Sequence, residues 1–136
     1  MTQAIRADQF LLDTNAVIAL MKGTPHFVAQ IKKHQPSAFC ITSITLHELY
    51  FGACKSVRRA ENLARISLLN LRVLEFDEQD ALFAGEARAS LAAAGTSIGP
   101  LDTLIAGVAL ARGLTLITQN TGEFKRVAGL RVSDWK

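Results

Sequence analysis

The chain has few cysteines and no long apolar run. Its two cysteines, Cys40 and Cys54, would allow one disulfide, but 136 residues supply enough core to fold without it, so we expect free thiols. Two cysteines and scattered histidines also do not make a zinc site. No apolar run reaches the roughly 18 uncharged residues that a membrane span requires. Residues 1–8 lack the apolar core of a signal peptide, which predicts a cytoplasmic protein without a membrane segment.

Glycine-rich turns and low-complexity segments are missing as well. No Gly-rich turn joins a strand to a helix, which excludes a Rossmann-type dinucleotide site. No repeat or linker divides the chain, and 49% of its residues are hydrophobic, which excludes disorder and predicts one domain over residues 1–136. The net charge of +3 is weak evidence for a nucleic-acid partner, because a solvated helix face or helix end can explain each basic group: Lys32 with Lys33, Lys55 with Arg58 and Arg59, and Lys125 with Arg126.

Strand-like runs alternate with helix-like runs, which predicts an α/β fold with a mostly parallel sheet. We expect strands at residues 10–12, 38–41, 72–75, 115–118 and 131–132. We expect helices at residues 15–21, 25–34, 43–54, 58–70, 78–94 and 100–112. Ser43 suits an N-cap and Pro100 suits a first helical position, while Gly95 and Gly113 stand where helices should end.

Three carboxylates lie in apolar segments of the sequence, where a charge is unfavourable. Asp13 ends the apolar run 10–12, Glu48 lies inside the largely apolar run 44–51, and Asp102 is the only charge between residues 100 and 110. Burying an unpaired carboxylate is costly unless a cation or hydrogen bonds compensate. No Lys or Arg in a matching apolar setting is available to pair with these acids, so they indicate a divalent metal site.

The predicted layout brings these acids to one edge of the sheet, because ligands of parallel α/β sheets bind beyond the carboxyl ends of the strands. Asp13 and Asn120 follow the first and fourth expected strands, and Glu48 and Asp102 lie near the starts of their helices. Both helical acids project over small neighbours, which leaves room for an ion. These neighbours are Thr45 and Gly52 for Glu48, and Ala106 and Ala109 for Asp102. The apolar face of the Glu48 helix is expected to hold Leu46, Leu49, Tyr50 and Ala53.

Each acid taken alone has a simpler structural explanation. Asp102 could complement the dipole of its helix from the first turn. Glu48 could be solvated on a half-exposed helix, and Asp13 could cap the helix that follows it. It is the joint pattern of the three acids that favours a site.

Five segments carry a resemblance to a known family. They are Leu12-Asp13-Thr14-Asn15, residues 43–52 around His47-Glu48-Leu49-Tyr50-Phe51-Gly52, residues 99–106 around Pro100-Leu101-Asp102, residues 118–124 around Asn120 and Glu123, and residues 127–135. In their order and spacing these segments resemble the PIN-domain ribonucleases, specifically the VapC-type toxins of bacterial toxin–antitoxin pairs. The resemblance runs from Phe10 to Trp135 and implies a three-layer α/β/α fold with a central, mostly parallel sheet.

The resemblance also implies an endoribonuclease that depends on Mg²⁺ or Mn²⁺. Asp13, Glu48 and Asp102 match the family's three acids and would hold the metal. The fourth position, often Asp in the family, is Asn120 here, so one charge is missing and a second metal is left open. Thr14, Asn15 and Thr118 would hydrogen-bond the ligands from behind. Glu123 could supply a further acid, directly or through water, or be a surface acid that starts a short helix. The histidines are not needed as bases, and His47 points away from Glu48 around the helix.

The family further implies partners. RNA is the expected substrate, often tRNA cut in its anticodon stem-loop, and an antitoxin of the VapB type is expected to place a basic side chain in the acidic pocket. A homodimer is expected too, with Tyr50, Phe51 and residues 58–70 as candidate contact surfaces.

Two other function classes share parts of this pattern. Haloacid-dehalogenase-like phosphatases also begin with a strand-end Asp, but they need a second acid two residues later, where this chain has Asn15. A non-catalytic α/β binding module would have no need of three convergent acids.

Overall fold

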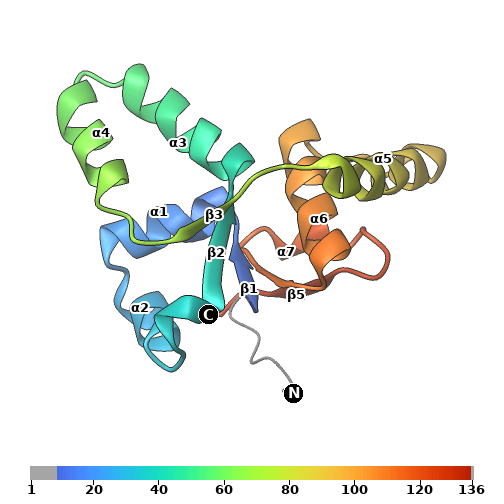
Figure 1. The fold of residues 1–136 in the computed structure, drawn as a ribbon. Helices are drawn as coiled ribbons and strands as arrows, with labels where there is room; N and C mark the ends of the chain where they lie inside the picture. The colour runs from blue at the N-terminus through green and yellow to red at the C-terminus, as the bar shows by residue number, and fades with distance from the viewer. Residues whose placement is uncertain (1–8, 136) are drawn as a thin grey trace.

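The computed structural model describes residues 9–135, so residues 1–8 and 136 of the predicted domain lie outside the described part. Strands and helices alternate along the chain (Figure 1). Their order is β1 (Phe10–Leu12), α1 (Thr14–Lys22), α2 (Pro25–Ile31), a 3₁₀ helix (Pro36–Ala38), β2 (Phe39–Thr42), α3 (Ser43–Cys54), α4 (Arg59–Ser67), β3 (Arg72–Leu74), α5 (Glu78–Ala93), α6 (Pro100–Arg112), β4 (Thr115–Ile117), α7 (Thr121–Phe124) and β5 (Arg131–Ser133).

The five strands form one sheet in the order β3-β2-β1-β4-β5, and all four pairings between them are parallel. Neighbouring residues of one strand point to opposite faces, so Leu11 packs under α5, α6 and α7, while Leu12 packs under α1, α2, α3 and α4. Both faces are therefore covered, as parallel sheets require. The predicted three-layer α/β/α fold with a mostly parallel sheet is confirmed.

The strand order reverses at β1. The chain winds from β1 to β2 and β3 on one side, then crosses through α5 and α6 to β4 and β5 on the other. The carboxyl ends of β1 and β4 flank this switch point, where α/β sheets open a crevice for ligands. Asp13 directly follows β1 and Thr118 directly follows β4.

Local details differ from the sequence-based expectations at helix ends. The predicted helices 25–34 and 58–70 are shorter, because after Ile31 and Ser67 the backbone closes tighter i→i−3 bonds, such as His34 N to Ile31 O at 3.1 Å and Leu69 N to Ile66 O at 3.0 Å. The short helix at Pro36–Ala38 was not predicted, whereas the one at Thr121–Phe124 agrees with the short helix considered for Glu123.

The predicted N-cap of α3 was wrong by one residue. Thr42 is the cap, and its hydroxyl accepts a hydrogen bond from Thr45 N at 3.0 Å. The Ser43 hydroxyl instead accepts from Phe76 N at 3.3 Å, which ties the start of α3 to the segment between β3 and α5. Pro100 does occupy the first position of α6, and Gly113 ends it in the left-handed conformation.

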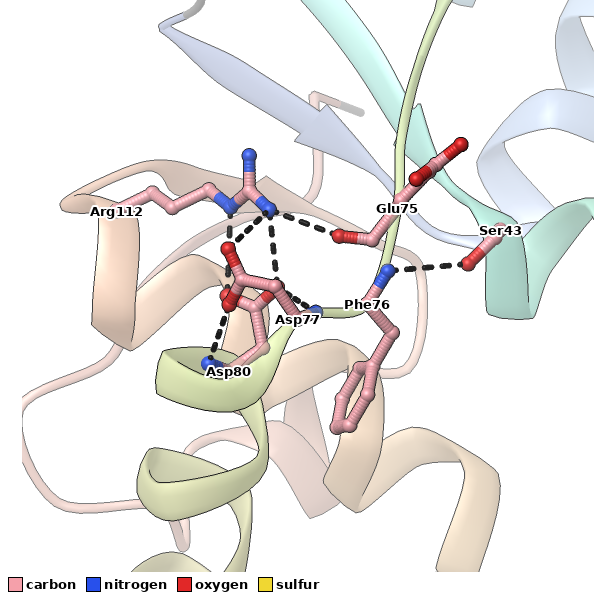
Figure 2. A network of polar contacts seen from close by, with 6 residues as sticks. All are labelled: Ser43, Glu75, Phe76, Asp77, Asp80 and Arg112. Atoms are coloured by element: carbon pink, nitrogen blue, oxygen red, sulfur yellow. Dashed lines mark hydrogen bonds and ion pairs between the residues drawn. The ribbon is translucent and has the colours of Figure 1, made fainter.

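An ion pair between the half-buried Arg112 and the buried Asp80 joins the end of α6 to the start of α5 (Figure 2). Arg112 donates to both carboxylate oxygens of Asp80, at 3.3 and 2.9 Å, and to Glu75 O at 3.0 Å. Asp80 is fully buried and also accepts from Asp77 N, completing a capping box. The pattern of the sequence did not single out this pair, because Asp80 lies in an ordinary helix start.

The structure contains neither a disulfide nor a membrane-spanning helix within residues 9–135. No disulfide joins Cys40 and Cys54, and Cys40 is buried whereas Cys54 is exposed. Across residues 9–135, none of the helices has the length and hydropathy needed to cross a lipid bilayer.

Candidate functional site

Asp13 is held at the end of β1 by both of its carboxylate oxygens. Oδ1 accepts from Ala16 N at 2.8 Å and so caps α1, while Oδ2 accepts from the hydroxyl of Thr118 at the end of β4. The side chain is only 3% exposed. Burial raises the pKa of Asp13; the two hydrogen bonds oppose this rise and the charge of Glu48 adds to it. The helix-cap explanation of Asp13 is therefore correct. Asp13 also lies near other acids, and we call Asp13, Glu48, Asp102 and Glu123 the acidic cluster.

Glu48 reaches the cluster from the middle of α3. Its Oε1 accepts a hydrogen bond of 2.6 Å from the hydroxyl of Thr14, the first residue of α1. Thr45, one turn earlier on the same stripe of α3, is fully buried, while Gly52, one turn later, leaves open space. The apolar face of the helix was predicted correctly at Leu49 and Ala53 but wrongly at Tyr50, which is 44% exposed. Tyr50 is solvated because no layer covers that side of α3 within the described residues.

Asp102 lies in the first turn of α6, over the fully buried Ala106. Burial raises the pKa of Asp102 to about 6, and the negative charges of Glu48, Asp13 and Glu123 contribute to the rise. A carboxylate destabilised by three others marks a point where a cation would be favoured. Asp102 also lies in the first turn of its helix, as the dipole explanation requires, but burial and the neighbouring acids raise its pKa.

Asn120 is the N-cap residue of α7, and Glu123 lies within this short helix. The Asn120 amide donates to Glu123 Oε2 at 2.6 Å, and the Asn120 backbone N–H donates to the Thr118 hydroxyl at 2.9 Å. The charge of Glu123, a half-buried residue, contributes to the raised pKa of Asp102. Asn120 orients that acid.

The remaining residues singled out in the sequence differ in whether their side chains contact the acids. Thr14 and Thr118 contact the acids through their hydroxyls. The side chain of Asn15 is exposed, and this residue acts on Asp13 only through its backbone N–H, which lowers the pKa of the carboxyl. His47 is exposed, as expected.

A groove that the sequence did not reveal leads away from Thr14 and Glu48 between α1, α3 and α4. Its volume is about 330 Å³. The lining is mostly apolar, with Ile18, Met21, Leu49, Ala53 and Ile66, and Lys22 and Arg65 add positive charge. Only the amphipathic pattern of three separate helices could have indicated it, and that pattern also fits plain core packing.

The donor set fits Mg²⁺ or Mn²⁺ better than a softer ion, since all candidate ligands are oxygen atoms. Within residues 9–135, no three His, Cys, Asp or Glu side chains are grouped tightly enough to enclose an ion. Mg²⁺ does not need such a cage, because it keeps several waters and is bound through one or two carboxylates. The charge repulsion at Asp102 is the observation that favours a cation here.

Comparison with known proteins identifies the family to which the chain is similar. Residues 10–130 match the model of the PIN domain family. The chain is 43% identical over 129 residues to the tRNA(fMet)-specific endonuclease VapC of Salmonella typhimurium, covering 93% of this chain and 98% of that protein. It is 36% identical over 129 residues to the ribonuclease VapC2 of Haemophilus influenzae, with the same coverage.

Solved structures agree with these relatives. The chain superposes on DNA-bound VapBC from Salmonella typhimurium with a TM-score of 0.89 at 43% identity, covering 95% of this chain and 99% of that one. It superposes on VapBC2 from Rickettsia felis, bound to a DNA fragment from its promoter, with a TM-score of 0.85 at 31% identity, covering 93% and 98%. This chain belongs to the PIN-domain family and, within it, to the VapC toxins.

Proposed function

We propose that this protein is an endoribonuclease toxin that requires Mg²⁺ or Mn²⁺, cleaves tRNA and is neutralised by a VapB-type antitoxin. Membership of the VapC toxins supports the ribonuclease activity and the antitoxin. The single observation that supports metal dependence is the raised pKa of Asp102, a half-buried carboxyl on which the charges of Glu48, Asp13 and Glu123 act.

In this proposal Asp13, Glu48 and Asp102 hold the metal. A bound divalent ion lowers the pKa of a water molecule and neutralises charge on the scissile phosphate. Hydrogen bonds from Thr118 and Ala16 N fix the orientation of Asp13, and Thr14 fixes that of Glu48. Asn120 holds Glu123 beside Asp102, where it can bind a water or a second ion. Orienting ligands in this way is worth tenfold to hundredfold in metal affinity or activity, on the order of 2 kcal/mol.

Acid-to-amide substitutions test the metal site. Asp13→Asn, Glu48→Gln and Asp102→Asn keep the shape of the side chain and remove its charge, so each should abolish RNA cleavage while circular dichroism reports an intact fold. EDTA should do the same to the parent protein, and added Mg²⁺ should restore activity. Parental cleavage by one variant would remove that residue from the site, and cleavage by clean parent protein in excess EDTA would refute metal dependence.

The proposed substrate is tRNA, cut in the anticodon stem-loop. Support comes from the Salmonella and Shigella flexneri relatives, both tRNA(fMet)-specific endonucleases at 43% identity. Sequencing RNA 5′ ends after brief expression of the protein, with Asp102→Asn as the control, should show new ends in an anticodon loop. New ends confined to ribosomal or messenger RNA would refute tRNA as the substrate.

We place the antitoxin-binding site in the groove between α1, α3 and α4, because this groove is mostly apolar and Glu48 is part of its lining. A basic antitoxin side chain entering the acidic cluster would form charge-assisted hydrogen bonds and compete with metal. Calorimetry should therefore show that Asp102→Asn and high Mg²⁺ each weaken antitoxin binding. Equal affinity under all these conditions would mean that the antitoxin blocks RNA sterically, without contacting the acids.

A homodimer and a cytoplasmic location complete the proposal. Light scattering of the isolated protein across a range of concentrations tests the first, and a monomer throughout would refute it. Fractionation of cells expressing the toxin with its antitoxin tests the second.

A further inference from the structure

Beyond Glu48, helix α3 carries an aromatic and basic surface that neither the core nor the acidic cluster uses. Phe51 follows Glu48 by three residues, which places the two side chains next to each other on the helix surface. Phe51 is 61% exposed. Lys55, one turn further along the same stripe, has its Nζ 4.8 Å from the centre of the Phe51 ring. The stripe therefore presents an acid, then an exposed aromatic ring, and then a cation that lies over one face of that ring.

The turn after α3 is basic and internally braced. Lys55, Arg58 and Arg59 lie in or beside it, and no acid occurs between residues 49 and 60. The Ser56 hydroxyl accepts from Arg58 N at 3.0 Å and from the Asn62 amide at 3.1 Å, and Arg59 Nη1 donates to Cys54 O at 3.4 Å. These bonds brace the turn and hold the Arg59 side chain, whereas the exposed Arg58 side chain lies 3.9 Å from that of Glu61.

This surface is separate from the apolar groove. Leu49, Gly52 and Ala53 face the groove between α1, α3 and α4, whereas Phe51 does not line it. Figure 1 shows α3 and α4 as a helical hairpin that projects away from the sheet, with the turn between them at its tip. Glu48 thus has the groove on one side and the exposed ring of Phe51 on the other.

The chemistry of this surface matches a nucleic-acid strand. Proteins bind single-stranded RNA by stacking bases on aromatic rings while cations follow the phosphates. A ring with a lysine beside it, followed by a braced basic turn, offers both contacts in the order in which an extended strand presents base and phosphate.

We propose that Phe51, Lys55, Arg58 and Arg59, together called the α3 platform, bind the RNA strand next to the acidic cluster. Phe51 stacks on a base close to the scissile phosphate, and the three cations contact neighbouring phosphates. The platform thereby sets which unpaired nucleotide lies beside Glu48. This inference rests on the proposed ribonuclease function, and it assigns Phe51, Arg58 and Arg59 to RNA in place of the dimer contact that the sequence suggested.

Stacking is tested by RNA binding without cleavage. Fluorescence anisotropy of a labelled anticodon stem-loop RNA, in EDTA, should give an affinity about tenfold weaker for Phe51→Leu than for the parent. Phe51→Tyr keeps an aromatic ring and should bind within about twofold of the parent. Leu82→Ala, at a 55% exposed apolar position on α5, is the matched control and should change nothing. Because Phe51 is mostly exposed, thermal melting should show all three variants folded.

The cations are tested by salt. Each phosphate contact contributes about 0.7 to the slope of log affinity against log salt for a single strand. Lys55→Gln should lower that slope by about this amount, and Lys33→Gln, an exposed lysine just beyond α2, should leave it unchanged.

The outcomes separate this inference from the proposed function. RNA affinity in Phe51→Leu equal to that of a parent that binds and cleaves RNA would overturn the platform alone. Unchanged RNA affinity, combined with loss of the dimer or of antitoxin binding, would also overturn it and make this surface a protein interface. A parent that neither binds nor cleaves any RNA would refute the ribonuclease function together with the platform.

Discussion

The hydroxyl of Thr14 and the carboxylate of Glu48, 34 residues apart in the chain, form a hydrogen bond of 2.6 Å across the mouth of the acidic cluster. Thr14 begins α1 directly after Asp13, so one short segment supplies a candidate ligand and the group that orients another. The bond also connects α1 to α3, two of the three helices that line the groove.

Removing this hydroxyl should weaken catalysis more than stability. Thr14→Val keeps the branched shape and deletes the donor, so Glu48 is free to rotate and RNA cleavage should fall about tenfold or more. Thr14→Ser retains the donor and should stay near the parental rate. Single-turnover cleavage, measured beside thermal unfolding, provides the comparison. Equal rates for the valine and serine variants would show that Glu48 needs no such support.

The metal-free protein should lose stability as the pH rises through the pKa of Asp102. That pKa is raised from an ordinary value of 3.8 to about 6, so the folded state holds the proton more tightly than the unfolded state. The stabilising contribution is fully present below about pH 3.8 and is lost as the pH rises through about 6. Urea unfolding in EDTA should show the parent losing stability relative to Asp102→Asn over this range. Mg²⁺ at neutral pH should reverse the loss in the parent only.

Breaking the Arg112–Asp80 pair should destabilise the fold. Arg112→Met leaves the carboxylate of Asp80 buried without its cation, at a cost on the order of 3 kcal/mol in the free energy of unfolding. Arg65→Met, which removes an exposed pair with Glu61, should cost less than about 1 kcal/mol. Denaturant unfolding of both variants checks this difference. Similar values for the two would mean that water reaches Asp80.

Two glycines on neighbouring helices should respond in opposite ways to alanine. A Cβ at Gly107 on α6 would lie 2.5 Å from Ala84 Cβ and 2.7 Å from its backbone, so Gly107→Ala must force α5 and α6 apart and should cost about 1–3 kcal/mol. A Cβ at Gly85 on α5 meets nothing within 4 Å, so Gly85→Ala should stabilise the helix by about 0.5–1 kcal/mol. Thermal unfolding midpoints moving in the same direction would contradict this account of the α5–α6 contact.

Much of the fold could be predicted from the sequence because its signals are local. Runs such as 10–12 and 115–117 are apolar on both faces, which indicates strands of a covered parallel sheet. Pro100 and Gly113 mark the ends of α6, where backbone geometry favours these residue types. The errors fall where two local solutions are nearly equal, as with Thr42 and Ser43, which could both cap α3 and differ only in whether Phe76 N is within reach.

The sequence also indicated the members of the acidic cluster, because lone acids in apolar runs are costly wherever they fold. It did not determine their surroundings. Glu123 could equally have been a surface acid, and only the approach of α7 to the start of α6 brings its charge onto Asp102. The role of Asn120 likewise depends on the turn that places its amide against Glu123.

By itself, then, the sequence determined the alternation of strands and helices, the parallel sheet and the three acids, since these follow from periodicity, backbone preferences and the cost of buried charge. The tertiary structure decided which distant groups meet. Thr118 reaches Asp13 across 105 residues, Arg112 neutralises Asp80 across 32, and Phe51 is left exposed beside Glu48. Such contacts depend on how helices cross the sheet and one another, and no local pattern along the chain carries that information.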